Sequence, residues 1–413
     1  MLDINKIREE KAAVTKALLK RLEKKDFDLD AVLEIDDRRR DLLQQAETLK
    51  AERNKFSKTK PDEKTIAQMR VVGDQIKALD EQIAGVEQEL QEKLSALPNL
   101  PADDVLPGGK ENNQVIKTFG KKPKFDFAPK DHYDLATDLG IIDYERAAKM
   151  SGTGFWIYKG AGALLEWAIL SYFIKFHQKN GYIFMIPPFL LTEQSAYTSG
   201  HLPKFRDDLF WTQDKTCLNA TSEMMLGNYH RDEVLLAEDL PYKYCAYSAC
   251  FRREAGSYRK EERGMIRGHQ FNKIEMFHYC KPDQSWDSFA ELVKNAELLV
   301  EGLGLHYQSV QLAAGDASAA MAKTVDVEVW IPSMDTYKEV SSVSNALDYQ
   351  ARRGNVRFKN TESGRNEFVH TLNASGLATS RLVPAILEQC QQKDGSVLVP
   401  KALREFCGFE KIS

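Results

Sequence analysis

The strongest constraint on the fold is a heptad repeat, broken once, in the first hundred residues. Pro61 is the only proline among residues 1–97, and it lies in the short break Ser57–Asp62. Residues at alternating spacings of four and three before the break are Ile35, Arg39, Leu42, Ala46, Leu49, Arg53 and Phe56. Those after it are Met69, Val72, Ile76, Leu79, Ile83, Val86 and Leu90, with Leu94 and Leu97 following a one-residue slip. Two such stripes joined by a short break predict an antiparallel coiled-coil hairpin, whose second helix would be roughly 50 Å long.

The outer end of this hairpin has more cations than anions. Its charged residues are Lys50, Arg53, Lys55, Lys58, Lys60, Lys64, Arg70 and Lys77 against Glu52, Asp62, Glu63 and Asp74. The pattern alone favours a solvated coiled coil used for dimerisation. A more specific alternative is an arm that contacts RNA phosphates.

Three prolines and two glycines within Leu97–Gly109 end the helical segment. We therefore expect an arm over residues 1–100, a linker over 101–122 and a second domain over 123–413. The second domain is rich in aromatic residues and mixes helical and strand patterns, which predicts an α+β fold. Gly108-Gly-Lys110 lacks the spacing of a phosphate loop and there is no GxGxxG, so ATP, if used, is bound in another way.

Composition sets limits on partners and location. The 57 Lys and Arg nearly balance the 61 Asp and Glu, so a nucleic acid must be met by a local patch. The six cysteines include no CxxC pair and no cluster with His at zinc spacing, which argues for reduced thiols and against a structural metal. No apolar run reaches membrane-spanning length and the first six residues lack a signal-peptide core. We expect a soluble, cytoplasmic protein with no membrane partner.

The stretch Cys250–Glu275 has the highest concentration of charged and aromatic side chains that could bind a ligand. Two predicted strands, Tyr244–Phe251 and His269–Phe277, flank a charged loop that includes Arg259 to Arg263. This stretch could form a nucleotide-binding site, in which guanidinium groups bind a polyphosphate and an aromatic ring stacks on a base. The residues concerned are Arg252, Arg253, Arg267 and Phe271. A solvated hairpin with salt bridges explains the same composition, and both readings stay open on residues alone.

Other segments have clear patterns. We expect strands at Gly154–Gly160, Gly181–Phe189 and Thr324–Pro332, and a helix with an apolar stripe at Ala163–Lys179. The strict alternation in Thr324–Pro332 places Asp326 and Glu328 on one face.

FRREAGS…RGMIRGHQFNKIE resembles motif 2 of class II aminoacyl-tRNA synthetases, in the form found in bacterial-type seryl-tRNA synthetases. The long helix and the strand ending in Pro187-Pro188 resemble motif 1, and Thr371–Glu388 resembles motif 3. Thr221-Ser-Glu223 and Glu339-Val-Ser-Ser342 resemble further family segments in the family's order. The resemblance implies an antiparallel sheet flanked by helices, in a class II catalytic domain, and a homodimer formed through motif 1.

The resemblance also implies roles for individual residues. Arg252 would hold the ATP α-phosphate and the substrate carboxylate, Glu254 the adenine amino group, Phe271 the adenine ring, and Arg381 the γ-phosphate, with Arg252 and Arg381 as the catalytic residues. Glu339 and Ser342 would bind Mg²⁺. The ATP-binding set is Arg252, Arg253, Glu254, Met265, Ile266, Phe271, Glu339, Val340, Ser341, Ser342 and Arg381. The serine-binding set is Thr221, Ser222, Glu223, Glu275 and Ser375.

The implied activity is that of an ATP-dependent serine–tRNA ligase forming AMP and pyrophosphate, with L-serine, tRNA(Ser) and Mg²⁺ as its partners. Whether tRNA(Sec) is also charged stays open. The chain departs from the family pattern at Asn219-Ala220, where an apolar-Pro pair is usual, and at Ser380, where Gly is common. These departures motivate an alternative, a non-catalytic synthetase paralogue; an enzyme that charges a carrier protein is a further one, disfavoured by the basic-tipped arm.

Overall fold

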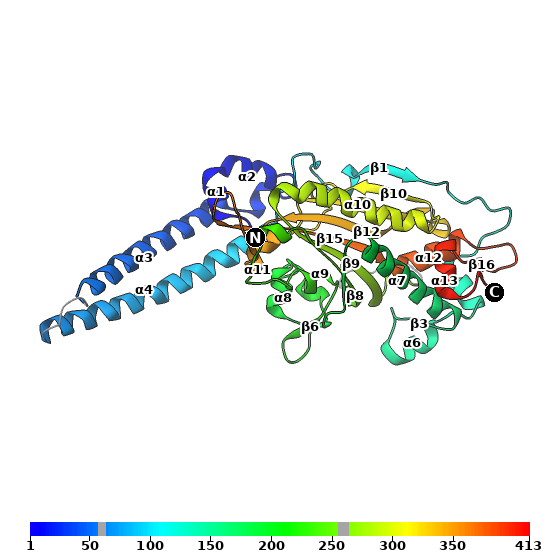
Figure 1. Ribbon diagram of the computed structural model, residues 1–413, viewed down its shortest axis with the longest axis horizontal. Helices are drawn as coiled ribbons and strands as arrows, with labels where there is room; N and C mark the ends of the chain where they lie inside the picture. The colour runs from blue at the N-terminus through cyan, green and yellow to red at the C-terminus, as the bar shows by residue number, and fades with distance from the viewer. Residues whose placement is uncertain (57–62, 255–263) are drawn as a thin grey trace. The chain divides into compact units, whose positions relative to one another are not determined.

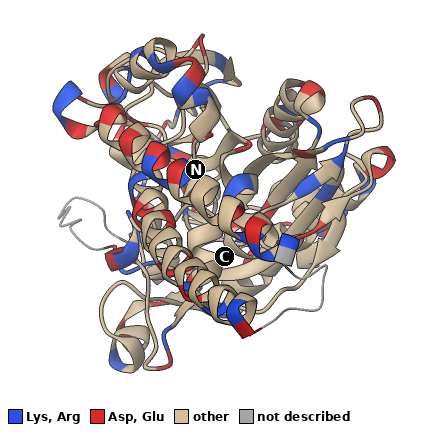
Figure 2. Ribbon diagram, turned by 90° about the vertical axis from the view of Figure 1, so that its left-hand side faces the viewer, with Lys and Arg blue, Asp and Glu red and all other residues tan. Residues whose placement is uncertain are grey.

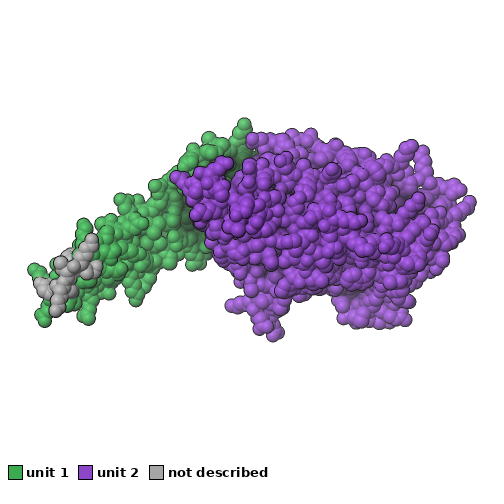
Figure 3. Space-filling view, in the orientation of Figure 1, with its two compact units in different colours: residues 1–100 green, residues 101–413 purple. Residues whose placement is uncertain are grey.

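The computed structural model describes residues 1–56, 63–254 and 264–413, which form two compact units, Met1–Leu100 and Pro101–Ser413 (Figure 3). The predicted break at Ser57–Asp62 and the charged segment Arg259 to Arg263 lie outside the described residues.

The first unit is helical. Two short helices, α1 (Ile4–Glu9) and α2 (Lys11–Leu18), precede the long helices α3 (Leu29–Phe56) and α4 (Glu63–Ala96) (Figure 1). The predicted heptad stripe of α4 is the buried stripe: Val72, Ile76, Ile83, Val86 and Leu90 are all buried. On α3, Ile35 and Ala46 are buried, whereas Arg39 is half-buried and Arg53 exposed.

Ion pairs between the two long helices show their direction. Arg38 pairs with Glu89, and the Lys50 ammonium lies 2.9 Å from the Asp80 carboxylate. As residue numbers rise along α3 they fall along α4, so the predicted antiparallel hairpin is confirmed. Residues of both charge signs are interspersed along the helices that face the viewer in Figure 2.

The second unit is built on an eight-stranded sheet in the order β1-β10-β11-β12-β15-β9-β8-β4 (Figure 1). All neighbouring strands are antiparallel except β4 and β8. The strands are β1 (Gln114–Phe119), β4 (Ile183–Met185), β8 (Tyr242–Phe251), β9 (Gln270–Cys280), β10 (Tyr307–Gln311), β11 (Lys323–Ile331), β12 (Thr336–Leu347) and β15 (His370–Ala378).

Small sheets and helices surround this sheet. The remaining strands are β2 (Ile142–Asp143), β3 (Ile157–Tyr158), β5 (Leu190–Thr192), β6 (Thr216–Leu218), β7 (Val234–Leu235), β13 (Arg357–Lys359), β14 (Asn366–Phe368), β16 (Val397–Leu398) and β17 (Lys411–Ile412). The helices are α5 (His132–Asp138), α6 (Tyr144–Ser151), α7 (Ala161–Lys179), α8 (Glu193–Thr198), α9 (Glu223–Leu226), α10 (Ser285–Gly302), α11 (Tyr349–Gly354), α12 (Thr379–Gln389) and α13 (Lys401–Cys407).

One face of the main sheet is covered by helices, and the other carries polar side chains over β11 and β12 and a second hydrophobic core over β8 and β9. Val325, Val327 and Val329 of β11 share a hydrophobic core with residues of α7, α10, α12 and α13. Side chains alternate along a strand, so Asp326 and Glu328 point to the opposite face, where they line a cavity. The predicted antiparallel sheet flanked by helices is confirmed, and the part of the second face that is not packed against α9 and α11 is where a site can form.

Several expected elements differ in length. The strand predicted at Gly154–Gly160 is reduced to β3, because Gly154 and Gly160 have positive φ angles that end extended structure. The predicted strand at Gly181–Phe189 is β4 alone. Residues 101–122, predicted as a linker, contain β1, which pairs with β10 at the edge of the main sheet. The helix predicted at Ala163–Lys179 is present as α7.

In the described part of the chain, no helix is both long and apolar enough to cross a membrane. All six cysteines are free thiols.

Candidate active site

Two adjoining cavities of about 440 and 410 Å³ open on the polar face of the main sheet. Both are lined by Arg267, Glu339, Ser342 and Arg381, so they form one continuous site. The first cavity is also lined by Asp326 and Glu328; the second extends to Thr221, Glu223, Arg252, Glu254, Lys273, Asn373 and Ser375. A small third cavity adds Phe271 and Ser380 and shares Ile266 with the first.

Arg252 follows β8 and is held in place by backbone groups. Its backbone N–H donates to the His269 carbonyl at 2.9 Å, and its Nε donates to the Ala220 carbonyl at 3.3 Å. Its guanidinium carbon lies 5.2 Å from the centre of the Phe271 ring, within the range of a cation–π contact. The predicted cation and the predicted ring therefore line one cavity.

Glu254 is paired with Arg267 across the motif 2 strands. The Arg267 Nε donates to the Glu254 carboxylate at 2.6 Å, and Glu254 has a left-handed backbone conformation with φ of 53°. A non-glycine residue in this region is held by its surroundings. This geometry turns the Glu254 side chain toward the cavity that Arg252 and Phe271 line.

Arg381 and Glu339 come from different motifs and contact each other. The Arg381 Nη1 donates to the Glu339 backbone carbonyl at 2.8 Å and lies 3.3 Å from the Glu339 carboxylate. Arg381 is the third residue of α12, a position that presents its guanidinium at the mouth of the cavity.

The Mg²⁺ prediction for Glu339 and Ser342 fits the oxygen chemistry of this corner. Asp326 is opposite Ser342 in the β11–β12 ladder, and both residues line the first cavity. The Asp326 Oδ1 is buried and has no hydrogen-bond partner among the described residues. Burial, and then the charge of Glu339, raise the pKa of Asp326 well above its usual value, an arrangement that a cation would relieve.

The described residues contain no group of three His, Cys, Asp or Glu side chains that could hold a metal by themselves. Mg²⁺ commonly takes one or two carboxylates and completes its shell with water and substrate phosphates. The residues present therefore fit a cation that shares the site with a polyphosphate.

Glu223 is the first residue of the short helix α9 and is buried. Its Oε1 accepts from the Gln350 amide at 2.7 Å, and Gln350 in turn accepts from the Thr371 hydroxyl at 2.7 Å. Burial, and next the charge of Glu275, raise the pKa of Glu223 to about 7, while Lys273 and Arg252 oppose this rise.

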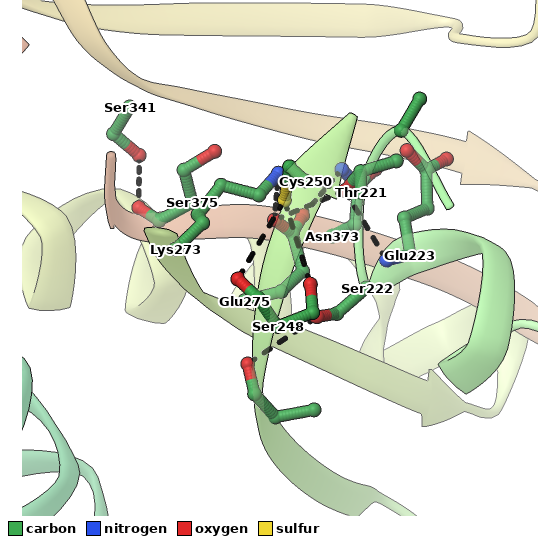
Figure 4. A network of polar contacts seen from close by, with 12 residues as sticks. Thr221, Ser222, Glu223, Ser248, Cys250, Lys273, Glu275, Ser341, Asn373 and Ser375 are labelled. Carbon is green, nitrogen blue, oxygen red and sulfur yellow. Dashed lines mark hydrogen bonds and ion pairs between the residues drawn. The ribbon is translucent and has the colours of Figure 1, made fainter. Parts of the chain in front are cut away.

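Lys273 and Glu275 form a buried ion pair on β9 (Figure 4). The Lys273 ammonium also donates to the Thr221 hydroxyl at 2.7 Å, and the Asn373 amide donates to Glu275 at 3.1 Å. The exposed fraction of Glu275 is 0 %, and Glu275 is not among the described residues that line the cavities. Thr221, Lys273 and Asn373 form the cavity wall in front of it.

Two predicted serine- or ATP-binding hydroxyls face elsewhere. The Ser222 hydroxyl lies 2.7 Å from the Ser248 hydroxyl, and Ser341 donates to the backbone carbonyl of Ser375. Both residues are fully buried, and neither is among the described residues that line a cavity. The Ser222 side chain thus binds to β8 beside the turn that carries Thr221, and the Ser341 side chain joins β12 to β15, which carries Ser375.

Three further residues of the predicted ATP set lie outside the described cavity walls. Met265 and Val340 are buried in the core that α7 and α12 share, and Arg253 is exposed. The Arg253 backbone N–H donates to the Asp208 carbonyl at 2.9 Å. Any contact of Met265 or Val340 with a nucleotide must come from the backbone.

Asn219 and Ala220, which depart from the family pattern, both form hydrogen bonds to neighbouring residues of the site. The Asn219 side-chain amide nitrogen donates to the Ser248 hydroxyl and to the Ala249 carbonyl, both at 3.0 Å, and the Asn219 backbone carbonyl accepts from the Phe251 N–H at 2.8 Å. The Ala220 carbonyl still accepts from Arg252. The departure is therefore compatible with a formed site. Ser380 lies in the wall of the third cavity, beside Arg381.

Sequence reasoning missed Lys273, Asn373 and Gln350. The signal for the first two was available, because strand alternation places residue 273 on the same face as Phe271 and Glu275, and residue 373 on the same face as Ser375. Gln350 gave no local signal, since it lies 127 residues from the carboxylate it contacts.

Comparisons with known proteins agree with this geometry. Residues 1–101 match the family described as seryl-tRNA synthetase N-terminal domain, and residues 205–390 match the tRNA synthetase class II core domain (G, H, P, S and T). The chain is 51% identical to serine–tRNA ligase 2 of Clostridium acetobutylicum over 100% of both chains. It is 44% identical to the serine–tRNA ligase of Geobacter sulfurreducens over 99% of both.

Solved structures agree as well. The seryl-tRNA synthetase of Pyrococcus horikoshii complexed with ATP is 33% identical, with a TM-score of 0.92 over 100% of this chain and 99% of that one. The cytoplasmic serine–tRNA ligase of Naegleria fowleri in complex with AMP is 29% identical, with a TM-score of 0.88 over the same shares. With a class II core, a matching N-terminal domain and full-length relatives of this kind, the chain belongs to the seryl-tRNA synthetase family.

Proposed function

We propose that this protein is a serine–tRNA ligase, which activates L-serine with ATP and transfers it to the terminal ribose hydroxyl of tRNA(Ser). The observation that carries the proposal is the continuity of the site. One cavity joins Arg252, Glu254 and Arg381 to a pocket of Thr221, Glu223 and Ser375. The names of the full-length relatives, and the ATP and AMP in the two similar solved structures, support it.

The ATP half of the site is a set of cations around a ring. Arg252 would hold the α-phosphate, Arg381 the γ-phosphate, and Phe271 the adenine. Glu254, held by Arg267, would accept from the adenine amino group. Forked guanidinium groups suit phosphate oxygens better than a single ammonium does.

The serine half is small and polar. Glu223, in its ionised form, would bind the α-ammonium of serine with Thr221 and Ser375 as hydrogen-bonding neighbours. Lys273 and Asn373, which line the cavity and hold Glu275 behind its wall, would bind the side-chain hydroxyl. A substrate without a hydroxyl would make no hydrogen bond to this wall, so serine is favoured over alanine. Threonine keeps the hydroxyl and would be excluded by the size of the pocket.

Two steps follow from this arrangement. The serine carboxylate, ionised at neutral pH, attacks the α-phosphorus of ATP, and pyrophosphate leaves with the electrons of the broken P–O bond. The ribose hydroxyl of the tRNA then attacks the acyl carbon of seryl-adenylate, and AMP leaves. The first step needs no side-chain base, so Arg252 and Arg381 act by aligning the reactants and by offsetting phosphate charge.

Glu339 and Ser342 would hold Mg²⁺, with Asp326 adding a carboxylate oxygen beside them. When bound, Mg²⁺ supplies positive charge to the phosphate oxygens of ATP.

The helical arm would contact tRNA. Its exposed cations near the outer end, Lys55, Lys64 and Arg70 among the described residues, can neutralise RNA phosphates without reading sequence. The family assignment supports tRNA(Ser) as the partner, and charging of tRNA(Sec) remains to be tested with the same assay. A cytoplasmic location is part of the proposal and agrees with the six free thiols.

A homodimer is also proposed, through the surface formed by the outward face of α7 and the edge strand β4. Trp167 and Ile183 have exposed fractions of 56 % and 58 %, and Ile186, just after β4, has 71 %. Large apolar side chains exposed together mark an interaction surface. Sedimentation velocity of the protein and of the Trp167→Arg variant tests this: a dimer that dissociates in the variant supports it, and a monomeric parent protein contradicts it.

The function is tested by aminoacylation with labelled serine, ATP and purified tRNA(Ser), using tRNA(Sec) and an acidic carrier protein as parallel acceptors. We expect label on tRNA(Ser). Label on the carrier protein alone, or formation of adenylate with no acceptor charged, would contradict the proposal. A folded protein that neither binds ATP nor forms adenylate would support the non-catalytic alternative.

A further inference from the structure

Glu166 is a buried carboxylate in the first half of α7, and no step described above uses it. Its exposed fraction is 2 %, and burial raises its pKa to about 7. A carboxylate buried at this depth is costly unless several donors hold it. The donors it contacts belong to the two motifs that form the ATP half of the site.

The first donor belongs to α12. The Thr379 hydroxyl donates to Glu166 Oε1 at 2.6 Å and is also 3.0 Å from the Asn272 carbonyl. Thr379 is the first residue of α12 and is fully buried, whereas Arg381, two residues later, lines the cavities. The N-cap residue of α12 is Ala378, whose side chain makes no capping hydrogen bond. Glu166 therefore holds the end of the helix that presents Arg381.

The second donor belongs to β9. The Asn272 amide donates to the same Glu166 oxygen at 2.8 Å, and its own Oδ1 accepts from the Tyr247 hydroxyl at 3.1 Å. Asn272 lies between Phe271 and Lys273, and strand alternation sends its side chain to the helix-covered face while theirs point to the cavity. The contact of Glu166 with Asn272 on the helix-covered face of β9 thus holds the neighbouring residue Phe271 in position.

We propose that Glu166 is a positioning residue for ATP: it fixes the distance between β9, which carries Phe271, and the start of α12, which carries Arg381. Through these contacts α7 sets the spacing between the groups proposed to bind the adenine and the γ-phosphate. The inference rests on the proposed function for the identity of the ligand, and on the described contacts for the geometry.

Tyr158 completes the surroundings of Glu166. The Tyr158 hydroxyl and Glu166 Oε2 are both buried, and neither has a hydrogen-bond partner within normal distance among the described residues. Glu166 Oε2 thus adds no contact to either motif, so the effect of Glu166 on the ATP half passes through its Oε1.

The test compares Glu166→Ala and Glu166→Gln with Glu388→Gln. Glu388 is a matched control, because it is a fully buried carboxylate near the other end of α12. It accepts from the His132 backbone N–H at 3.0 Å and from the Ser333 N–H and hydroxyl, both at 2.8 Å. The readouts are the KM values for ATP and for serine in pyrophosphate exchange, the Kd of ATP measured by calorimetry, and the thermal midpoint.

We expect Glu166→Ala to raise the KM and Kd of ATP roughly tenfold, the worth of a hydrogen bond to a charged group, with the KM of serine nearly unchanged. Glu166→Gln keeps Oε1 as an acceptor and should recover most of the affinity. Glu388→Gln should lower the thermal midpoint without this selective effect. Equal changes for ATP and serine, or an ATP affinity unchanged in folded Glu166→Ala, would overturn the proposal.

Two further measurements keep the test decisive. If Glu166→Ala does not fold, Thr379→Val takes its place, because it removes the hydroxyl that donates to Glu166 with little change of shape. This variant should raise the Kd of ATP. Combining it with Glu166→Gln should raise that Kd no further. An unchanged Kd in folded Thr379→Val would overturn the proposal. If the parent protein binds ATP but shows no serine-dependent exchange, the proposed function fails, and the Kd of ATP still decides the role of Glu166.

Discussion

The Arg381 guanidinium lies 3.3 Å from the Glu339 carboxylate and donates to the Glu339 backbone carbonyl at 2.8 Å. The group expected to hold the γ-phosphate and the group expected to hold Mg²⁺ are therefore within reach of one polyphosphate. Asp326 and Ser342 lie in the wall of the same cavity. When ATP and a cation bind, the contact between Arg381 and Glu339 can be replaced by two others, one between Arg381 and a phosphate and one between Glu339 and the cation.

Glu339→Gln should weaken the dependence of the reaction on Mg²⁺. The amide keeps the shape of the side chain but removes the anion, so we expect the half-saturating Mg²⁺ concentration in pyrophosphate exchange to rise roughly tenfold or more. The KM for serine should change less than the Mg²⁺ dependence, because Thr221, Glu223 and Ser375, and not Glu339, are the groups proposed to bind serine. A Mg²⁺ titration identical to that of the parent protein would remove Glu339 from the proposed metal site.

Arg252→Ala should abolish adenylate formation while the fold persists. Loss of one preorganised cation at a developing charge costs about 10²–10³-fold in rate. Arg253→Ala is the matched control, because Arg253 is the adjacent arginine and does not line the described cavities. We expect the control to retain most of the activity. Near-normal exchange in the Arg252 variant, with an unchanged melting curve in both, would contradict the assignment.

Lys273→Met should destabilise the protein more than Glu275→Gln does. Removing the ammonium leaves Glu275 charged, fully buried and short of a partner, a loss of about 3–5 kcal/mol in the free energy of unfolding. The double variant should be more stable than Lys273→Met alone, because it removes both charges. Denaturant unfolding measures all three; additive losses would show that the two side chains do not interact as a pair.

Serine binding should weaken as the pH falls through 7. Burial and the charge of Glu275 raise the pKa of Glu223 to about 7, and the ammonium group of serine binds only its ionised form. Below that pH, protonation competes with the substrate, so the KM of serine should rise by roughly tenfold per pH unit. Between about pH 8 and the pH at which the serine ammonium itself loses its proton, the KM should be flat. Glu223→Gln should raise the KM and remove the slope, and a slope that survives in this variant must come from another group.

Reversing exposed charges on the arm should affect tRNA and not serine activation. We expect a triple variant, Lys55→Glu, Lys64→Glu and Arg70→Glu, to raise the KM for tRNA and to make binding less dependent on salt, by about one unit of slope for each phosphate that the arm no longer neutralises. Pyrophosphate exchange needs no tRNA and should be unchanged. Equal charging efficiency at 50 and 200 mM salt in both proteins would exclude a phosphate-binding arm.

The sequence predicted most of this architecture because the relevant patterns are local. The heptad spacing predicted the stripe of Val72, Ile76, Ile83, Val86 and Leu90 that α4 buries. Alternation predicted that Asp326 and Glu328 share a face of β11, and both line the same cavity. Motif resemblance located Arg252, Glu254, Phe271, Glu339 and Arg381, all of which line the site.

What the sequence did not predict depends on contacts between distant residues. Glu166 and Thr379 are 213 residues apart, and Gln350 and Glu223 are 127 apart. No periodicity connects such pairs. Ser222 and Ser341 show a second limit of prediction from sequence. Resemblance to a motif locates a segment at the site, but packing decides which of its side chains face the cavity and which bond to a neighbouring strand.

The most direct test of serine activation at this site is ATP–pyrophosphate exchange with serine, threonine, alanine and cysteine supplied one at a time. We predict exchange with serine alone, since alanine lacks the hydroxyl that Lys273 and Asn373 would bind, cysteine offers a weaker hydrogen-bonding thiol, and threonine exceeds the size of the pocket. Exchange with alanine at a comparable rate, or no exchange with any of the four from a folded protein, would contradict this prediction.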